Sequence, residues 1–596
     1  MLRPTRTREF AWAFAALTVV TLAALGQQTS DLYAVPDRGD PLFSMWRMGW
    51  VRHQIAADPR HLFDANIFYP RPATLTYSDS MILPALVSAP LAWFHPVVAY
   101  NITLLAAFVL SGVAAYLLAR ALGMTALGAW IAAIAFTIAP FRMNHFSHLE
   151  LQMTMWMPIA LLATYRLVAD STGGATVARG LDLSKLAPMS QVFWVKTVRA
   201  SARRYQAYDL ARRSLDGLRR SLARPWRSVT LAVVLAAQWY SSMYYGLFLT
   251  LYVVVFAAVL IVSGRVRDRR LWHLVGALCI AAALVSPLMV VYVRSVPERG
   301  ERPRDAVAAF SAVPADYART GSHNPVYRAL LPRPIHAERA LFPGAATIVL
   351  AAAGAWPPLT AWRAAIIGAG VVAFDGSLGL NGVLYPLLYR WFPPLHSVRV
   401  PARFAMLVVL TLGLLAGSGA MRLLARFRSV KTRVVAVAAL TGVIIADAWP
   451  HSDRLPVWQS PPSIYAALPR AAVLFEFPVH SPADRFSENL PYMYFSLWHW
   501  RPLVNGYSGF TPASYEALLQ GVSSFPETRA LKYLEDVGVT HIALHCRLWE
   551  PDVCVSLMSR LDATGGVRRL ARAEWYGAPS TLYELSRDPG SGIRDP

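Results

Sequence analysis

Ionisable side chains gather in four short segments that lie between strongly apolar runs of the chain. These segments are DRGDP (37–41), FDANIFYPRPATLTYSD (63–79), FRMNHFSHLEL (141–151) and LHSVRVPARF (395–404). The side chains of interest in them are Asp37, Asp40, Asp79, His145, His148, Glu150, His396, Arg399 and Arg403. Carboxylates and imidazoles exchange protons or bind metal ions, and guanidinium groups bind anions. Because such groups are costly beside lipid, their concentration here predicts a functional site at a membrane surface.

Each segment also has a purely structural interpretation. Asp40 is followed by a proline and by the helical sequence LFSMWRMGWVRHQI, a context that predicts an N-cap with proline at the first helical position. In the same sense, His145 and His148 would be polar residues at the membrane interface. Arg399 and Arg403 would then bind lipid headgroups and nothing else.

The composition indicates that membrane-spanning helices position these residues. Of the 596 residues, 55% are hydrophobic and only 15% are charged, whereas soluble domains are about a quarter charged. Apolar runs recur along the chain, and we predict a polytopic α-helical membrane protein with about eleven transmembrane helices. The predicted spans are 10–26, 97–119, 124–140, 152–168, 229–243, 246–263, 271–290, 345–361, 364–380, 404–420 and 433–448.

The basic residues set the orientation of these spans. The net charge is +22, but Lys and Arg lie between apolar runs, as in cytoplasmic loops that contact anionic lipid, and this pattern argues against nucleic-acid binding. The basic loop 170–228 is therefore predicted to lie in the cytoplasm, as is the N-terminus. Its apolar residues recur every three or four positions over 192–222. This spacing predicts a basic amphipathic helix, either on the inner leaflet or docked against the membrane domain.

On the outer side we expect two long loops, 27–80 and 291–343. The loop 291–343 is rich in arginine, against the positive-inside rule, but long loops obey that rule weakly. Within the chain, the stretch 81–95 (MILPALVSAPLAWFH) is apolar but short and interrupted by prolines, which predicts a re-entrant or interfacial helix. The chain is thus divided into a transmembrane domain (1–448) and an extracytoplasmic domain (449–596).

The C-terminal domain has the pattern of a small α/β fold. AVLFEFPV (472–479) and HIALHC (541–546) are typical of buried strands. RALKYLEDVG (529–538) predicts a helix that closes with Gly538 at its C-cap. Cys546 and Cys554 lie in one short segment of an oxidising compartment, so the alternatives are a disulfide or two buried thiols.

In their order, these segments resemble bacterial glycosyltransferases of the GT-C superfold, the class that includes protein O-mannosyltransferases, aminoarabinose transferases and oligosaccharyltransferases. Members have an outward span, a long external loop with an acidic motif, interfacial helices, and a second external loop with another acid. The matching residues here are Asp40, with Asp37 nearby, and Glu150 in HLE. The first motif reads GDP in place of paired acids, which leaves the role of Asp37 open.

Three further strings resemble a large bacterial branch of that class. They are SLGLNG (377–382), VRVPARF (398–404) and LWHWRPLVNGYSGFTP (497–512). The resemblance extends over nearly the whole chain, although its specificity lies in the order and topology of the motifs. It implies a multi-pass protein of the bacterial cytoplasmic membrane.

The resemblance also implies a reaction. Outside the cytoplasmic membrane no nucleotide sugar is available, so the donor is expected to be a sugar on a polyprenyl phosphate, with no nucleotide cofactor. The acceptor is a glycan, lipid or protein outside the membrane. Asp40 would be the general base in a single displacement that inverts the anomeric centre.

The remaining residues acquire roles from the same resemblance. Arginine forks bind phosphate bidentately, so Arg399 and Arg403, together with His396, would hold the departing phosphate. Glu150, with His148 or His145, would hold a divalent metal cation or position the acceptor directly. Asp37 and Asp79 complete the set of candidate site residues.

Two other function classes fit a chain of this kind. A transporter or lipid flippase needs ionisable residues deep inside its spans, and discontinuous helices in repeated halves. Only Asp375 and Asp447 stand out within the predicted spans, both near an outer end. A non-catalytic membrane scaffold for assembly is the other alternative.

Overall fold

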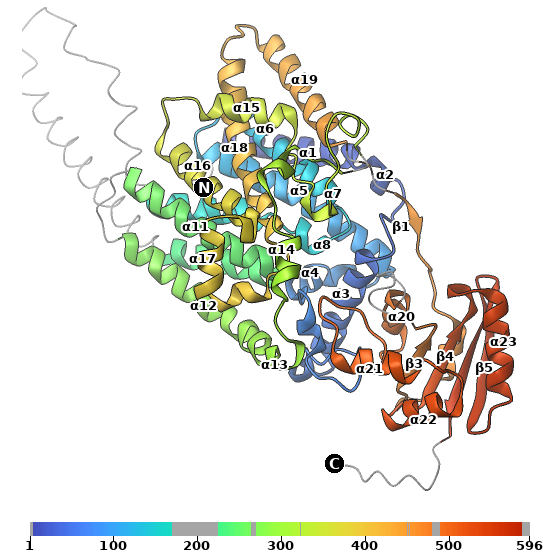
Figure 1. The fold of residues 1–596 in the computed structure, drawn as a ribbon. Coiled ribbons are helices and arrows are strands. Elements are labelled where there is room, and N and C mark those ends of the chain that lie inside the picture. Colours follow the sequence, from blue (N-terminus) through green and yellow to red (C-terminus); the bar gives the residue numbers. More distant parts are fainter. Residues whose placement is uncertain are drawn as a thin grey trace, which may run out of the picture.

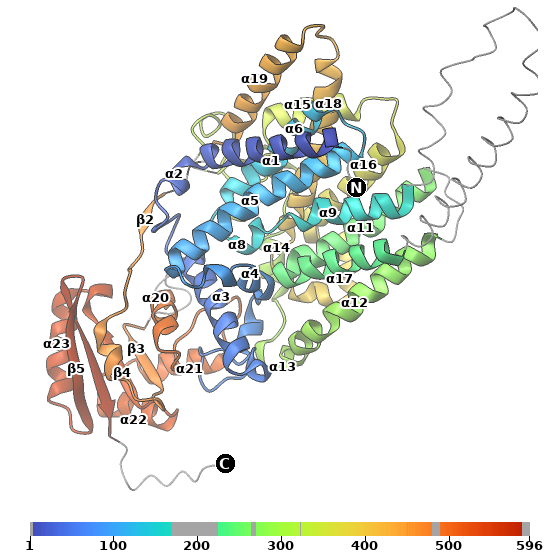
Figure 2. The same ribbon diagram turned by 180° about the vertical axis from the view of Figure 1, so that it is seen from behind.

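The structure is a computed structural model that describes residues 4–169, 225–263, 270–321, 324–449, 451, 453–479 and 489–586. A bundle of helices forms one part of the molecule, and a small sheet flanked by helices lies at the other end (Figures 1 and 2). The predicted amphipathic helix of the basic loop lies outside the described residues.

Six of the described helices are long and apolar enough to cross a membrane. They are α5 (Pro96–Ala121), the helix Ala126–Asn144 that joins α6 (Ala126–Thr137) to α7 (Pro140–Asn144), α11 (Met243–Ser263), α12 (Arg270–Arg294), α16 (Ala361–Leu378) and α18 (Ala405–Leu424). The molecule is therefore mostly helical, as expected for a polytopic membrane protein.

The other predicted spans also coincide with helices, but these are shorter or less apolar. They are α1 (Pro4–Ala24), α9 (Trp156–Ala169), the helix 225–241, α15 (Ala345–Ala355) and α19 (Val430–Ala448). The larger total that the apolar runs predicted is not confirmed by the length and composition of these helices, and it stays a prediction.

Helix α18 crosses α6 and α15 at close range (Figure 1). A Cβ atom at Gly354 of α15 would overlap the carbonyl oxygen of Leu415, and one at Gly419 of α18 would overlap that of Leu350. Small residues at such crossings let helix backbones approach in lipid, where apolar burial alone gives little drive to associate. Close packing of the helix backbones therefore stabilises the bundle together with apolar burial.

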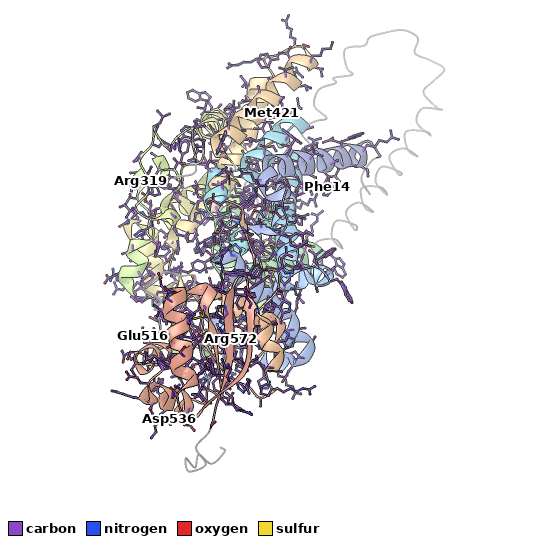
Figure 3. The ribbon with its side chains drawn as sticks, turned by 90° about the vertical axis from the view of Figure 1, so that its right-hand side faces the viewer. Phe14, Arg319, Met421, Glu516, Asp536 and Arg572 are labelled. Atoms are coloured by element: carbon purple, nitrogen blue, oxygen red, sulfur yellow. A yellow bond between two sulfur atoms is a disulfide. The ribbon has the colours of Figure 1, made fainter. Side chains whose placement is uncertain are left out.

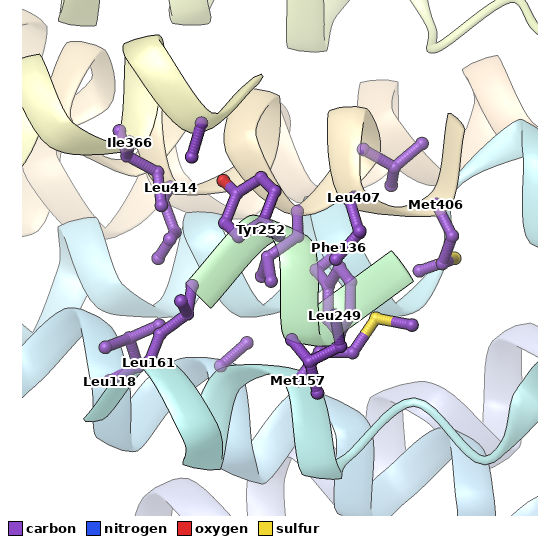
Figure 4. Close-up of a cluster of buried hydrophobic side chains, with 14 of the residues drawn as sticks. Leu118, Phe136, Met157, Leu161, Leu249, Tyr252, Ile366, Met406, Leu407 and Leu414 are labelled. Atoms are coloured by element: carbon purple, nitrogen blue, oxygen red, sulfur yellow. The ribbon is translucent and has the colours of Figure 1, made fainter. Parts of the chain in front are cut away.

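A continuous apolar core joins the helices around this crossing. Figure 4 shows part of it, with side chains that include Leu118 of α5, Phe136 of α6, Leu161 of α9, Leu249 of α11 and Leu414 of α18. The hydroxyl of Tyr252 lies 2.7 Å from Thr411 Oγ1, so this buried polar pair is satisfied within the core. The core fixes the helix ends that carry the external segments.

Short helices cover one end of the bundle. They are α2 (Gly26–Thr29), α3 (Asp40–Ala57), α4 (Ile82–Val87), α8 (Leu149–Gln152), α13 (Val296–Arg299), α14 (Arg304–Ala309) and α17 (Leu384–Trp391). The stretch 81–95 forms α4 and a 3₁₀ turn (Ala89–Leu91), which are too short to cross a membrane, as predicted. Its exposed side chains include Trp93 and Phe94, as suits an interfacial segment.

The C-terminal part contains a four-stranded sheet in the order β3-β4-β6-β5. Strand β3 (Leu474–Phe477) runs parallel to β4 (His541–His545), while β6 (Ala578–Leu585) runs antiparallel to both β4 and β5 (Val567–Trp575). The helices α21 (Ala513–Gly521), α22 (Thr528–Asp536) and α23 (Pro551–Asp562) accompany it. Both predicted strands are confirmed as buried strands.

The predicted C-cap at Gly538 is one residue off, whereas the predicted disulfide alternative is present. The C-cap of α22 is Val537, and Gly538, with φ of +91°, lies one residue further on, where a left-handed residue commonly ends a helix. Cys546 and Cys554 form a disulfide with a Cα–Cα distance of 5.3 Å, so the disulfide alternative is correct.

The C-terminal part is interleaved with the first external loop. Strand β1 (Ala34–Val35) pairs antiparallel with β2 (Leu455–Pro456). Leu503 N donates to Asn66 O at 3.0 Å, and α20 (Leu490–Phe495) packs on α3. Figure 3 shows Glu516, Asp536 and Arg572 at the end of the molecule away from Met421 of the bundle. The loop before α21 is thereby carried back onto the membrane domain.

Candidate active site

A cavity of about 600 Å³ lies where the first external loop, the bundle and the C-terminal part meet. One side of its wall is ionisable and the other is apolar. The ionisable lining consists of Asp40, Arg47, Asp79, His148, Glu150, Arg299, Glu301, Arg302, Arg399 and Arg403. Six of the nine side chains predicted as site residues are therefore brought together: Asp40, Asp79, His148, Glu150, Arg399 and Arg403.

Asp40 begins α3, and its carboxylate faces His148. The predicted N-cap role is wrong: Gly39 occupies the cap position, and Asp40 is the first helical residue and makes no capping bond. The Asp40 Oδ2 atom lies 3.1 Å from His148 Nε2. Burial raises the pKa of Asp40 above its ordinary value, although His148 partly opposes the shift. This carboxylate is suited to accept a proton.

Glu150 is paired with an arginine that the sequence analysis missed. Arg47 Nη2 donates to Glu150 Oε2 and to Ser44 Oγ, each at 3.1 Å, and Nη1 donates to the carbonyl oxygen of Asp79 at 3.2 Å. Burial would raise the pKa of Glu150, but Arg47, His148 and Arg403 together lower it below its ordinary value. Glu150 is therefore ionised and holds Arg47 in place.

Asp79 joins the first external loop to the start of α11. Its Oδ1 accepts from Met243 N at 2.8 Å, and its Oδ2 accepts from Ser242 Oγ at 3.1 Å. The bond from Met243 N satisfies one of the amide groups that a helix leaves unpaired at its N-terminus. Burial raises the pKa of Asp79 to about 6. Asp79 lines the cavity, but its oxygens are already used by the protein.

Asp37 and His145 lie behind the cavity wall. Asp37 Oδ1 accepts from Gly39 N at 2.7 Å and so shapes the turn that leads into α3. His145 Nε2 lies 2.8 Å from Glu338 Oε2, and its Nδ1 lies 2.8 Å from the carbonyl oxygen of Phe141. Both imidazole nitrogens of His145 are thus occupied.

The predicted metal ligands do not converge. Glu150 is bound to Arg47, His148 faces Asp40, and His145 faces Glu338. Within the part of the chain that the structure describes, no group of three or more His, Cys, Asp or Glu side chains is placed to hold a metal ion. The proposed set of His145, His148 and Glu150 is therefore corrected, and no chemistry is assigned to a metal at this site.

The predicted phosphate-binding residues divide into two kinds. Arg399 and Arg403 line the cavity, with Arg403 bound to Glu338 through two nitrogens. Among the described residues, Arg399 has no carboxylate within ion-pair distance. His396 points elsewhere: its Nε2 is 2.7 Å from Tyr389 O and its Nδ1 is 3.4 Å from Glu301 Oε1. His396 therefore does not line the cavity, and its imidazole reaches it through Glu301.

Two arginines of the loop 291–343 complete the basic wall. The guanidinium carbons of Arg299 and Arg302 lie 4.5 and 3.4 Å from the ring centre of Phe510. Burial lowers the pKa of Arg302 to about 10, so its charge persists at neutral pH. Like Arg399, it has no carboxylate at ion-pair distance within the described chain. The excess of arginine in this loop, which conflicted with the positive-inside rule, was the available signal.

A loop of the C-terminal part closes the cavity. Tyr507 packs edge-on against Phe43 of α3, with ring centres 5.2 Å apart. A Cβ atom at Gly509 would lie 2.7 Å from the carbonyl oxygen of Tyr77, so only glycine fits there without a shift of the backbone. Phe510 then covers the faces of both arginines. Arg299 donates to Ser295 Oγ and Ser397 Oγ, each at 3.2 Å, whereas Arg302 Nε is buried without a hydrogen-bond partner among the described residues and is able to bind an anion.

The apolar side of the cavity is formed by helices of the bundle. Its side chains are Trp239 of the helix 225–241, Met243 and Leu247 of α11, and Met289 and Val293 of α12. Arg299 and Arg302 follow the C-terminal end of α12 in the chain and line the same cavity. The cavity can therefore accept a molecule with an anionic group attached to a hydrocarbon chain.

Comparison with protein families and with curated proteins gives no match. Solved structures do match: the arabinofuranosyltransferase AftD from mycobacteria aligns with a TM-score of 0.59 and 14% identity over 98% of this chain. A mutant form of AftD aligns with the same TM-score and 12% identity. The chain spans only 40% and 42% of the lengths of these two structures. Its fold is thus similar, over nearly its whole length, to part of a mycobacterial arabinofuranosyltransferase.

Proposed function

We propose that this protein is a membrane glycosyltransferase of the GT-C type that transfers a sugar from a polyprenyl-phosphate donor to an acceptor hydroxyl. The observation that carries the proposal is the cavity, in which the Asp40–His148 pair, the arginines and an apolar wall meet. The similarity of the fold to AftD supports it. The sugar enters between the carboxylates and the arginines, and the hydrocarbon chain lies along α11 and α12.

The orientation of the membrane domain supports this choice of donor. The basic segments of the sequence favour a cytoplasmic N-terminus, with the basic loop against anionic lipid of the inner leaflet. The cavity and the C-terminal domain then face outward from the cytoplasmic membrane of a bacterium. A lipid-linked sugar is the activated donor that is available on that side.

The reaction is one displacement at the anomeric carbon. Asp40 accepts the proton of the acceptor hydroxyl as its oxygen forms a bond to that carbon. The bond from the anomeric carbon to the phosphate oxygen breaks, and polyprenyl phosphate leaves with the electron pair. Arg302 and Arg399 stabilise the charge that develops on the phosphate. The configuration of the sugar is inverted.

His148 and Arg47 position the reacting groups. His148 Nε2 donates to Asp40 Oδ2 and turns the other carboxylate oxygen toward the acceptor. Arg47 fixes Glu150, whose carboxylate lines the cavity and binds hydroxyl groups of the acceptor or of the sugar. The buried charges here are paired, which keeps them in the ionised state.

Replacement of Asp40 tests the proposed base. Asparagine has nearly the same shape as aspartate and can still accept a hydrogen bond from His148, so Asp40→Asn should remain folded, and its melting temperature checks this. Transfer should fall by roughly 10² to 10⁴, the usual contribution of a positioned base. The purified protein is assayed in lipid nanodiscs with synthetic polyprenyl-phosphate sugars and an acceptor extract from the cell envelope.

Asp58→Asn is the matched control, since Asp58 lies at the far end of the same helix and outside the cavity. This variant should transfer sugar like the wild type. Full activity of Asp40→Asn would refute the base assignment. Failure of the wild-type protein to use any donor of the polyprenyl-phosphate class would refute the proposed function.

A further inference from the structure

The ion pair of Arg403 is unusual among the arginines of the cavity, because its partner lies behind the wall. Arg403 belongs to the 3₁₀ turn Pro401–Phe404 at the start of α18 and lines the cavity. Its Nε donates to Glu338 Oε2 at 3.1 Å and its Nη2 donates to Glu338 Oε1. Such a two-point contact fixes the plane of a guanidinium group. Nη1 is then the nitrogen left to face a ligand.

Glu338 is held from its other side by a histidine. His145 Nε2 lies 2.8 Å from Glu338 Oε2, and its Nδ1 lies 2.8 Å from the carbonyl oxygen of Phe141. Both ring nitrogens of His145 therefore face acceptors, and the ring holds Glu338 against the backbone of Phe141. Burial would raise the pKa of Glu338, but Arg403 and His145 bring it well below its ordinary value.

The turn that carries Glu338 is itself anchored. Glu338 lies in the 3₁₀ turn Ala337–Arg339. The next residue, Arg339, donates from Nε to Asp316 Oδ2 at 2.7 Å, and Asp316 is fully buried. Asn144 Nδ2 donates to the carbonyl oxygen of Ala340 at 3.2 Å. The carboxylate of Glu338 thus has a fixed backbone behind it.

We propose that Glu338, held in place by His145, is the positioning residue that orients Arg403 for the donor phosphate. The inference rests on the proposed function, because it assigns Arg403 to the phosphate of that donor. Glu338 itself does not line the cavity, so it acts through Arg403.

The test measures phosphate binding by purified full-length protein, with farnesyl phosphate as the probe. Glu338→Gln and Arg403→Gln should each weaken binding, by up to roughly a hundredfold, because a small displacement of a binding group can cost that much. The double variant should bind no more weakly than Arg403→Gln alone, since Glu338 acts through Arg403. Glu338→Asp keeps the charge and should recover part of the affinity. In the transfer assay, kcat of Glu338→Gln should fall more than KM rises.

Glu476→Gln is the control, because it removes a buried carboxylate of the C-terminal sheet that pairs with a histidine, His545, away from the cavity. It should lower the melting temperature and leave the affinity for farnesyl phosphate unchanged. Wild-type affinity in Glu338→Gln, or additive losses in the double variant, would overturn the positioning role. If the wild type does not bind the probe, the proposed donor is refuted. In that case melting temperatures still test the contact between Glu338 and Arg403. If the losses of the two single variants add in the double variant, the contact is overturned, and if the double variant loses less than their sum, it is supported.

Discussion

Four carboxylates line the cavity, and the three that were predicted from the sequence differ in their surroundings. Arg47 keeps Glu150 ionised, and Ser242 and Met243 occupy both oxygens of Asp79. Asp40 combines a raised pKa with a neighbour, His148, that leaves one carboxylate oxygen available. Environments that push carboxyl pKa values apart identify acid and base roles. These surroundings therefore favour Asp40 as the general base over Glu150 and Asp79.

The raised pKa of Asp79 predicts a pH-dependent stability. An acid whose folded pKa is raised binds its proton more tightly in the folded state. Asp79 therefore stabilises the fold fully below its ordinary pKa of 3.8, and this contribution is lost as the pH rises to about 6. The loss amounts to at most about 3 kcal/mol.

The predicted pH dependence is checked by measuring the melting temperatures of the wild type and of Asp79→Asn between pH 4 and pH 8. The advantage of wild type over the variant should be greatest near pH 4 and should shrink as the pH approaches 7. Asp536→Asn serves as the comparison, since Asp536 is exposed. A constant difference across the pH range would show that Asp79 does not titrate in this window.

At the scale of helices, the crossing of α15 and α18 depends on residues without side chains. Gly354→Ala should lower the melting temperature and the yield of folded protein, because the new Cβ would overlap the carbonyl oxygen of Leu415. Gly442→Ala in α19 is the matched control, because a Cβ there meets no atom within 4 Å. The control should be neutral or stabilising by up to about 1 kcal/mol, from helix propensity alone. Equal effects of both substitutions would contradict the tight crossing.

Helices and strands could be predicted from the sequence better than the side-chain contacts between distant residues. Apolar runs and strand patterns mark helices and strands locally, so each predicted span coincides with a helix. The Arg47–Glu150 pair joins residues 103 positions apart, and no local pattern encodes that contact. Arg302 was not predicted as a site residue, because its partner, Phe510, lies about two hundred residues away in the C-terminal part of the chain. His396 was included because it lies near Arg399 in the chain, although its imidazole points to Tyr389.

At the scale of the whole molecule, the orientation in the membrane can be measured directly. Ser429 lies in an exposed turn before α19 that is predicted to be cytoplasmic, and Ser559 lies on the exposed face of α23 in the C-terminal domain. In a Cys279→Ser background, Ser559→Cys should react with an impermeant thiol reagent in intact cells. Ser429→Cys should react only after permeabilisation. The opposite pattern would overturn the proposed orientation and with it the outward-facing cavity.

The interleaving of the first external loop with the C-terminal part has a consequence for biosynthesis. Residues 34–35 and 66 are made early, but their hydrogen-bond partners at 455–456 and 503 are made only after α19. Chains are synthesised from the N-terminus, and segments fold as they emerge. In the proposed orientation, the first loop therefore remains without these partners outside the membrane until the last helix has been inserted. The nascent chain can assemble the Asp40 side of the cavity early, but it acquires the covering Tyr507–Phe510 loop only when translocation is nearly finished.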